Sequence, residues 1–253
     1  KPLFNDIDTE KPEQKQFAGK LAILGGNKSQ FFSAISSAET ATKLGVGEVK
    51  VILPDSLKGK IPTLSNIDFL PAELSGGFDK NSRLRFSEII ATSEYLIVIG
   101  DLGKNSTTAI AVNEFIKSFP KGILLTRDSI DLVTPDAANW IEQGNITLLS
   151  TLPQLQKLFR SLFYPKIITL SMPTNQLIET LHKFTISYPT TIITLHNKQI
   201  IIAKDGTVVT TEISETPYNP LSFWSGALAT KISTLSIWNK NNPLHAAATA
   251  ILQ

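Results

Sequence analysis

The sequence predicts an α/β fold with a mostly parallel central sheet and helices on both faces. The first observation is the opening unit, where an apolar run at residues 21–24 stops at a glycine pair before a helical pattern and a second apolar run. Strand, helix and strand in this order form a βαβ unit, whose two strands are parallel. The second observation is that short apolar runs alternate with helical patterns along most of the chain.

The first helix is predicted over residues 31–44, because apolar residues and alanines recur there at helical spacing. Gly45 follows directly and is expected to end the helix in a left-handed conformation. A short helical element is expected to start over residues 129–133. Further helices are predicted over residues 86–92, 107–119, 152–163, 174–187, 221–237 and 243–252.

The strands are predicted from short apolar runs between turn residues. The polar turn at residues 196–199 lies between two such runs and predicts a hairpin. Residues 1–20 are polar and are read as an N-terminal tail, and residues 1–253 as a single domain. The predicted strands are residues 21–24, 49–53, 95–99, 122–126, 146–149, 167–170, 191–195, 200–203 and 208–211.

Composition excludes several classes of function. A net charge of +2 over 253 residues provides no electrostatic footprint for nucleic acid. With no cysteine and only 3 widely spaced histidines, the sequence predicts no disulfide, no thiol nucleophile and no metal site. No apolar run approaches the roughly 20 residues that cross a bilayer, and residues 1–16 lack the apolar core of a signal peptide, so we expect a cytoplasmic protein without membrane contact.

The opening βαβ unit carries a specific glycine turn. It reads Gly25-Gly26-Asn27-Lys28-Ser29 and leads through an alanine-rich helix to Gly45-Val46-Gly47. This segment resembles the opening strand, glycine turn and first helix of the NAD(P)H-hydrate dehydratases. Those proteins are ribokinase-like lyases that use ATP or ADP to dehydrate damaged nicotinamide cofactor.

Later segments extend the resemblance over most of residues 19–253. Residues 97–103 resemble the family's Val-Ile-Gly-Pro-Gly-Leu-Gly loop but are one residue shorter. Residues 124–130 resemble its Val-Leu-Asp-Ala-Asp-Ala-Leu, with Asp128 as the second Asp, and residues 243–248 resemble its closing helix. The resemblance implies a ribokinase-like fold, ATP or ADP with Mg²⁺ as cofactor, and a homo-oligomer.

The family's functional positions carry different residues in this chain. The family's Thr-Pro-His-Pro-Gly-Glu segment corresponds to residues 149–154, so that its His and Glu become Thr151 and Gln154. Its phosphate-binding Lys corresponds to His196, which Asn197 follows. Its Gly-Thr-Gly-Asp turn, whose Asp is the catalytic base, corresponds to residues 223–226, so that Gly226 takes the place of the Asp.

The resemblance therefore implies a ligand cleft at the carboxyl ends of the strands but no catalytic residue that can be named. The candidates for nucleotide or phosphate binding are His196, Asn197, Ser225 and Gly226. The candidates for the substrate cleft are Gly25, Gly26, Gly100, Asp128, Thr151 and Gln154.

Each candidate also has a structural interpretation. The glycine pair is either an anion cradle or a tight turn from strand to helix. Asp128 either binds a substrate hydroxyl or Mg²⁺, or caps the helix that follows. His196 either donates to phosphate or is a solvated or capping residue of its turn. The pair Phe223-Trp224 either stacks on a ligand ring or plugs the cradle.

We expect a divergent dehydratase-like protein that has lost catalysis and acts as a binding or assembly module, with a nucleotide or dinucleotide as ligand. The alternative is an active ATP- or ADP-dependent dehydratase, or a small-molecule kinase, with a rebuilt site. It would take its base from Asp101, Asp128, Asp131 or Glu215. A third interpretation is a structural scaffold that forms homo-oligomers through residues 223–224.

Overall fold

Nine strands form one sheet in the computed structural model, which describes residues 4, 7, 12–61, 65–212, 223–240 and 242–252. The sheet order is β3-β2-β1-β4-β5-β6-β7-β8-β9, with parallel pairing from β3 to β7 and antiparallel pairing from β7 to β9. The mostly parallel sheet is thereby confirmed. The strands are β1 (Lys20–Gly25), β2 (Glu48–Pro54), β3 (Ile67–Leu70), β4 (Tyr95–Gly100), β5 (Gly122–Thr126), β6 (Ile146–Leu149), β7 (Thr191–His196), β8 (Gln199–Lys204) and β9 (Thr207–Glu212).

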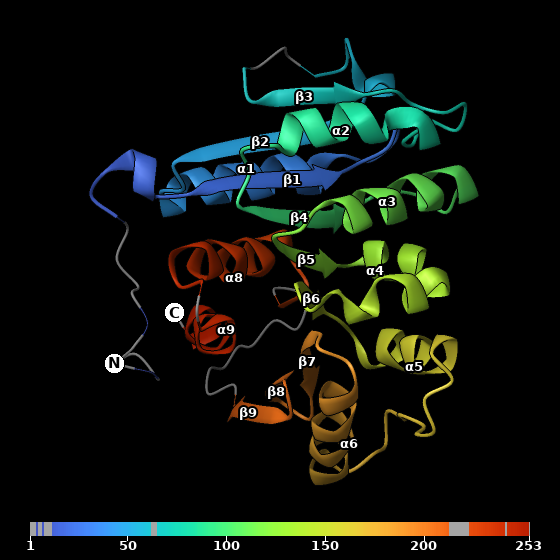
Figure 1. Ribbon diagram of the computed structural model, residues 1–253, viewed down its shortest axis with the longest axis vertical. Coiled ribbons are helices and arrows are strands. Elements are labelled where there is room, and N and C mark those ends of the chain that lie inside the picture. The colour runs from blue at the N-terminus through green and yellow to red at the C-terminus, as the bar shows by residue number, and fades with distance from the viewer. Residues whose placement is uncertain are drawn as a thin grey trace.

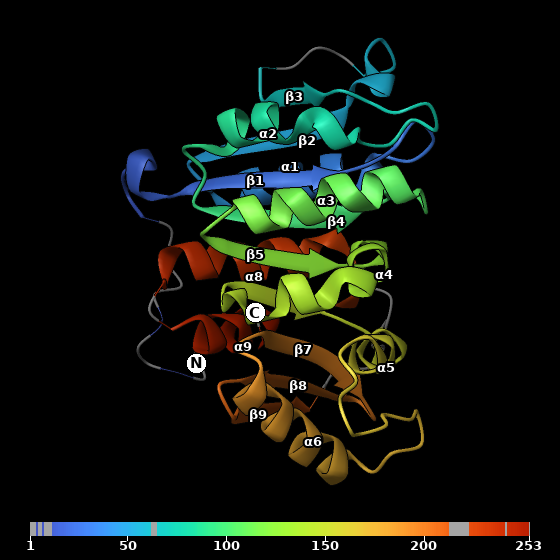
Figure 2. The same cartoon turned by 45° about the vertical axis from the view of Figure 1, so that its right-hand side comes forward.

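Helices cover both faces of the sheet, as Figures 1 and 2 show. One face carries α1 (Phe32–Leu44), α8 (Gly226–Trp238) and α9 (Pro243–Leu252). The other carries α2 (Arg83–Ile90), α3 (Ser106–Ser118), α4 (Asp128–Val133), α5 (Leu152–Ser161) and α6 (Thr174–Ser187). None of the helices described is both long and apolar enough to cross a bilayer.

The strands are apolar throughout because both of their faces are buried. In β4, Leu96 and Val98 pack into the core beneath α2–α6, whereas Ile97 and Ile99 pack into the core beneath α1, α8 and α9. A strand between two helical layers needs apolar residues at every position rather than at alternate ones. This explains why the sequence showed continuous apolar runs.

The end of α1 follows the sequence prediction. Gly45 has φ +96°, and its N–H donates to the carbonyls of Ala41 and Thr42, each at 3.1 Å. A glycine takes this left-handed conformation without the steric cost that a Cβ would add. The chain can therefore leave α1 sharply and enter β2 beside β1.

Two predictions about strands were wrong. Residues 167–170 form no strand in the described structure, and the side chains of Ile167 and Leu170 are each 72 % exposed. Because β6 and β7 already pair directly, the sheet leaves no place for another strand between them. The sequence analysis also missed β3, an edge strand whose first three residues are only half-buried and which has no continuous apolar run.

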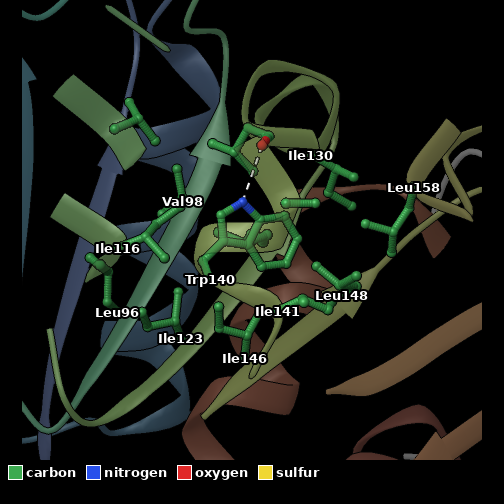
Figure 3. Packing of buried hydrophobic residues seen from close by; sticks show 14 of the residues in the cluster. Leu96, Val98, Ile116, Ile123, Ile130, Trp140, Ile141, Ile146, Leu148 and Leu158 are labelled. Atoms are coloured by element: carbon green, nitrogen blue, oxygen red, sulfur yellow. Dashed lines mark hydrogen bonds between the residues drawn. The ribbon is translucent and has the colours of Figure 1, made fainter. Parts of the chain in front are cut away.

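The largest side chain that is fully buried, among the described residues, is Trp140. Its indole lies among apolar side chains from several elements, including Ile130, Leu148 and Leu158, as Figure 3 shows. The indole N–H donates to the carbonyl of Val133 at 3.1 Å. The ring therefore fixes the end of α4 against β5 and β6, next to the strand ends where ligands bind in open α/β sheets.

We predict that Trp140→Phe lowers the free energy of unfolding by about 2 kcal/mol, because it removes a buried hydrogen bond and part of a packed ring. The matched control is Trp238→Phe, since the half-buried Trp238 makes an equivalent bond to the Ala18 carbonyl at 3.1 Å. Urea unfolding of both variants measures the difference. Equal losses at the two positions would contradict this account of the core.

Candidate functional site

The glycine turn after β1 is closed by its own hydrogen bonds. Gly26 has φ +86° and donates its N–H to the Gly100 carbonyl at 3.0 Å. The N–H groups of residues 27–30 all donate to acceptors within the protein: Lys28 donates to the carbonyl of Gly76, and the others bond within the turn. An anion cradle needs N–H groups that point at the ligand. The turn as folded offers no such group in residues 26–30.

Gly25 is required by the close approach of two strands. A Cβ at this position would lie 2.5 Å from Cγ2 of Ile99 and 2.8 Å from the carbonyl oxygen of Gly100. Backbone oxygen cannot move aside without disturbing β4. The glycine pair is thus explained by packing of β1 against β4, whatever else it does.

The carboxylate of Asp128 joins the ends of β4 and β5. One oxygen accepts from the N–H of Asp101 at 2.8 Å and the other from the N–H of Leu102 at 3.1 Å. Asp128 is the first residue of α4, but its side chain is directed at this neighbouring loop and not at its own helix. Gly100 makes room for it, since a Cβ there would lie 2.2 Å from Oδ1 of Asp128.

Two residues beside this carboxylate have unusual backbone conformations. Asp101 has φ +57°, and Arg127 has φ +59° with ψ −143°. Their side chains form an ion pair at 2.8 Å, with the Asp101 side chain only 11 % exposed. Non-glycine residues in such conformations cost about 1–3 kcal/mol each and cluster at functional sites. Asn27 adds a further bond from its amide to the Asp101 carbonyl at 2.6 Å.

Thr151 and Gln154 form a capping box at the start of α5. The Gln154 N–H donates to Thr151 Oγ1 at 3.4 Å, and the Thr151 N–H donates to Gln154 Oε1 at 3.0 Å. The Gln154 amide also donates to the Arg127 carbonyl at 2.7 Å and to Asp131 at 2.8 Å. The sequence analysis missed this role, although Thr-x-x-Gln before an apolar run is the signature of a capping box.

His196 is buried and is hydrogen-bonded to the backbone. Its side chain is 6 % exposed, and Nε2 lies 2.7 Å from the carbonyl oxygen of Met172. Because a carbonyl only accepts, Nε2 carries the proton and donates it. Asn197 and Lys198 then form the two-residue turn to β8, with φ +48° and +61°. The histidine therefore fixes the segment before α6 to the end of β7.

The start of α8 is tightly packed. A Cβ on Gly226 would lie 2.4 Å from Ser37 Oγ and 3.1 Å from Ile99 Cδ1. Just before Ser225, the Phe223 ring is 3 % exposed and stands at 82° to the Trp224 ring, with centroids 4.5 Å apart. The start of α8 is therefore preceded by a buried aromatic ring that packs in the core beneath α1 and α8.

An open groove of about 800 Å³ lies between α3 and α4 and extends to α5. We call it the α3–α4 groove. Its floor includes the apolar residues Ile110 and Leu132, and charges of both signs surround it. Among the sequence-predicted candidates that the structure describes, Asp128 and Asp131 border it. The charged lining residues are Lys104, Lys117, Lys157, Glu114, Asp128, Asp131 and Asp136.

The structure brings some of the predicted residues together and separates others. Gly25, Gly26, Gly100 and Asp128 adjoin one another at the ends of β1, β4 and β5. Thr151 and Gln154 join them through the Arg127 carbonyl, and Gly226 packs on Ile99. His196 and Asn197 bond instead to residues 172–174. No group of three or more His, Asp or Glu within the described ranges has the geometry to hold a metal ion.

Comparisons with known proteins identify the fold. No protein-family model matches the sequence, and neither does any curated protein. A ribokinase-like superfamily protein from Enterococcus faecalis matches 97 % of this chain and 81 % of its own, with TM-score 0.73 and 14 % identity. A hypothetical protein from Streptococcus mutans matches 97 % of this chain and 83 % of its own, with TM-score 0.72 and 16 % identity.

A third structure has a known reaction. The ADP/ATP-dependent NAD(P)H-hydrate dehydratase from Bacillus subtilis, co-crystallised with ATP and Mg²⁺, matches 99 % of this chain and 86 % of its own. Its TM-score is 0.60 and its identity 13 %. This chain has the ribokinase-like α/β fold. At these sequence identities, the structural similarity shows the fold alone.

We predict that Asp128→Asn lowers the free energy of unfolding by about 1–3 kcal/mol, because the new amide cannot accept from both N–H groups and leaves a donor unpaired. Asp136→Asn is the matched control, since that carboxylate pairs with Lys117 at a more open position and should cost well under 1 kcal/mol. Chemical unfolding compares the two. An equal cost at both positions would contradict a bridging role for Asp128.

A second prediction concerns the start of α8. The Ser37 hydroxyl is buried without a hydrogen-bond partner in the described structure, so Ser37→Ala should raise stability by up to about 1 kcal/mol. Gly226→Ala should cost about 1–3 kcal/mol by overlap with Ser37 Oγ. The double variant should recover most of that cost in a double-mutant cycle. Strictly additive effects would show that the two residues are not in tight contact.

Proposed function

We propose that this protein is a ribokinase-like protein that has lost catalysis and acts by binding. One observation carries the proposal: Gly226 stands where the dehydratase resemblance expects the catalytic Asp, and its Cβ position is 2.4 Å from Ser37 Oγ. A general base must be a titratable group placed at the reacting proton. Neither a carboxylate nor a smaller side chain has room at this position unless α1 and α8 separate.

The residues at the start of α8 do not fit ATP or ADP with Mg²⁺. A phosphate needs glycine-lined backbone N–H groups with free space before them. Here a bulky aromatic residue, Phe223, stands where the resemblance expects a glycine, and its ring belongs to the core beneath α1 and α8. His196, at the position of the family's phosphate-binding Lys, uses its Nε2 proton on the Met172 carbonyl. These contacts support the proposal that the start of α8 no longer binds a nucleoside triphosphate.

The other carboxylates near the strand ends are all engaged. Asp128 accepts from two backbone N–H groups, and Asp101 pairs with Arg127. Asp131 pairs with Lys157 and accepts from the Gln154 amide. Carboxylate oxygens that already accept hydrogen bonds from protein donors have less free capacity to accept from a substrate group. This supports the loss of a base rather than its relocation.

The α3–α4 groove is where we place a bound ligand. An apolar floor with charges of both signs suits a ligand that combines a flat ring with polar groups. The four acidic residues of its lining outnumber its three lysines. That net negative balance repels the triphosphate of ATP more strongly than the less charged pyrophosphate of a dinucleotide. The binding partner we propose is therefore a dinucleotide.

A specific observation favours an active enzyme as the second candidate. Asp101 and Arg127 keep left-handed backbone conformations next to this groove, and such strain is commonly retained for function. An active dehydratase or small-molecule kinase would then recruit Asp101, Asp128 or Asp131 as its base. Glu215, the other acidic candidate from the sequence, lies outside the described residues.

A turnover assay distinguishes the inactive binding protein from the active enzyme. Purified protein with hydrated NADPH, ATP or ADP, and Mg²⁺ should form NADPH at least about 1,000-fold more slowly than the Bacillus subtilis dehydratase, because a missing base alone costs about 10²–10⁴-fold. Formation of NADPH is followed by absorbance. Turnover that Asp128→Asn abolishes and Glu179→Gln, on α6 outside the groove, leaves intact would establish the active enzyme and refute the loss of catalysis.

A further inference from the structure

A second cavity lies at the opposite edge of the sheet, where the strands begin. It has a volume of about 550 Å³. Tyr95, Gly122 and Thr191 open β4, β5 and β7 along its wall, and the end of α8 and the start of α9 complete it. In Figure 1 the arrowheads of β1 and β4 point away from this edge. We call it the strand-start cavity; it shares no lining residue with the α3–α4 groove.

Lysines dominate the charge of the strand-start cavity. Lys121 donates to the Ser93 carbonyl at 2.7 Å, and Lys240 bonds to the carboxylate of Glu94. Because Ser93 and Glu94 are adjacent, both ammonium groups lie on one side of the cavity. Lys204 comes from the other side. Of the charged lining residues described, the three lysines face one carboxylate, that of Glu94, which leaves a net charge of +2.

Lys204 is held next to the start of β7. Ala203 pairs with Ile192 in the antiparallel β7–β8 register, so Lys204 follows beside Thr191. The Lys204 side chain is 20 % exposed, and its nearest carboxylate is that of Asp205 at 3.8 Å. Because the Asp205 carboxylate is exposed, water screens this pair, and the Lys204 ammonium can still attract a second anion.

The hydroxyl groups in the wall form an ordered chain. Ser236 donates its proton to the Ile232 carbonyl at 2.7 Å, and the side chains of Ser236 and Thr147 both interact with the Tyr95 hydroxyl. Burial raises the pKa of Tyr95, which keeps the phenol neutral. Gly122 makes room for the ring, since a Cβ there would lie 2.3 Å from Cε2 of Tyr95. The wall is therefore polar, uncharged and rigid.

One hydroxyl of the lining has no protein partner. Thr191 is 2 % exposed and borders the cavity, and within the described residues its side chain makes no hydrogen bond. Because the residue borders the cavity, its hydroxyl is available to a ligand that enters there. It lies beside Lys204, so a donor and a cation are directed to the same part of the cavity.

We propose that the strand-start cavity binds a small phosphorylated molecule. Lysine ammonium groups bind phosphate as compact point charges, and two of them stand across the cavity from the third. The Thr191 hydroxyl donates to a phosphate oxygen, while the ring edge of Tyr95, Ile237 and Pro243 contact the organic part of the ligand. This site is independent of whether the opposite edge of the sheet is catalytic.

Phenyl phosphate is the probe, followed by amide chemical shifts in a ¹H–¹⁵N NMR titration of the full chain. We expect saturable shifts at residues 95, 122, 147 and 191, and at least a tenfold loss of affinity in the variant Lys121→Ala/Lys204→Ala. Lys183→Ala is the matched control, because that lysine pairs with Glu179 on α6, away from the cavity, and the affinity should not change.

Thr191→Val provides a test that spares the charges, since it removes the hydroxyl while it keeps the shape of the side chain. We expect it to weaken phenyl phosphate several-fold and to leave the fold intact. Benzoate should bind more weakly than phenyl phosphate. The proposal is overturned if the shifts scatter over surface lysines without saturating, if Thr191→Val binds like the unmodified chain, or if benzoate binds as tightly.

Discussion

The close contact of α8 with α1 and β4 is the constraint on which the functional edge of this molecule depends. Gly226 has no side chain because Ser37 and Ile99 already occupy the space where a Cβ would lie. Phe223, three residues before Gly226, is buried in the same core as α1 and α8. The dehydratase resemblance implies a phosphate and a catalytic carboxylate at residues 223–226. The packing at Gly226 is therefore the observation on which our proposal of lost catalysis rests.

The loops next to it are joined by hydrogen bonds rather than left open for a ligand. Asp128 holds the loop after β4, Arg127 pairs with Asp101, and Gln154 holds the Arg127 carbonyl from α5. These bonds offset the cost of two left-handed non-glycine residues. The edge is therefore held in place by the protein's own contacts. An ordered edge suits recognition, because a ligand that binds it pays little for ordering the site.

The sequence predicted the parts of the structure that depend on local patterns. Gly45 after an alanine-rich helix and the polar turn before β8 have local causes, and both predictions hold. The apolar run at residues 167–170 was predicted to be a strand, because a sequence pattern does not show whether the sheet has room for a further strand. The Thr-x-x-Gln pattern of the capping box is visible in the sequence, but Thr151 and Gln154 were predicted to lie in the substrate cleft. The contact between Gly226 and Ser37 joins residues far apart in the chain, so no local pattern reveals it.

Titration calorimetry with ATP and Mg²⁺ tests the central claim most directly, because it measures whether the start of α8 still accepts a triphosphate. The account predicts no saturable heat from ATP up to millimolar concentration, since Phe223 and the contact at Gly226 leave no cradle. Saturable binding with a dissociation constant in the micromolar range, weakened by substitutions at Ser225 or His196, would contradict it. The nucleotide site would then be intact, and its chemistry would have to be sought there.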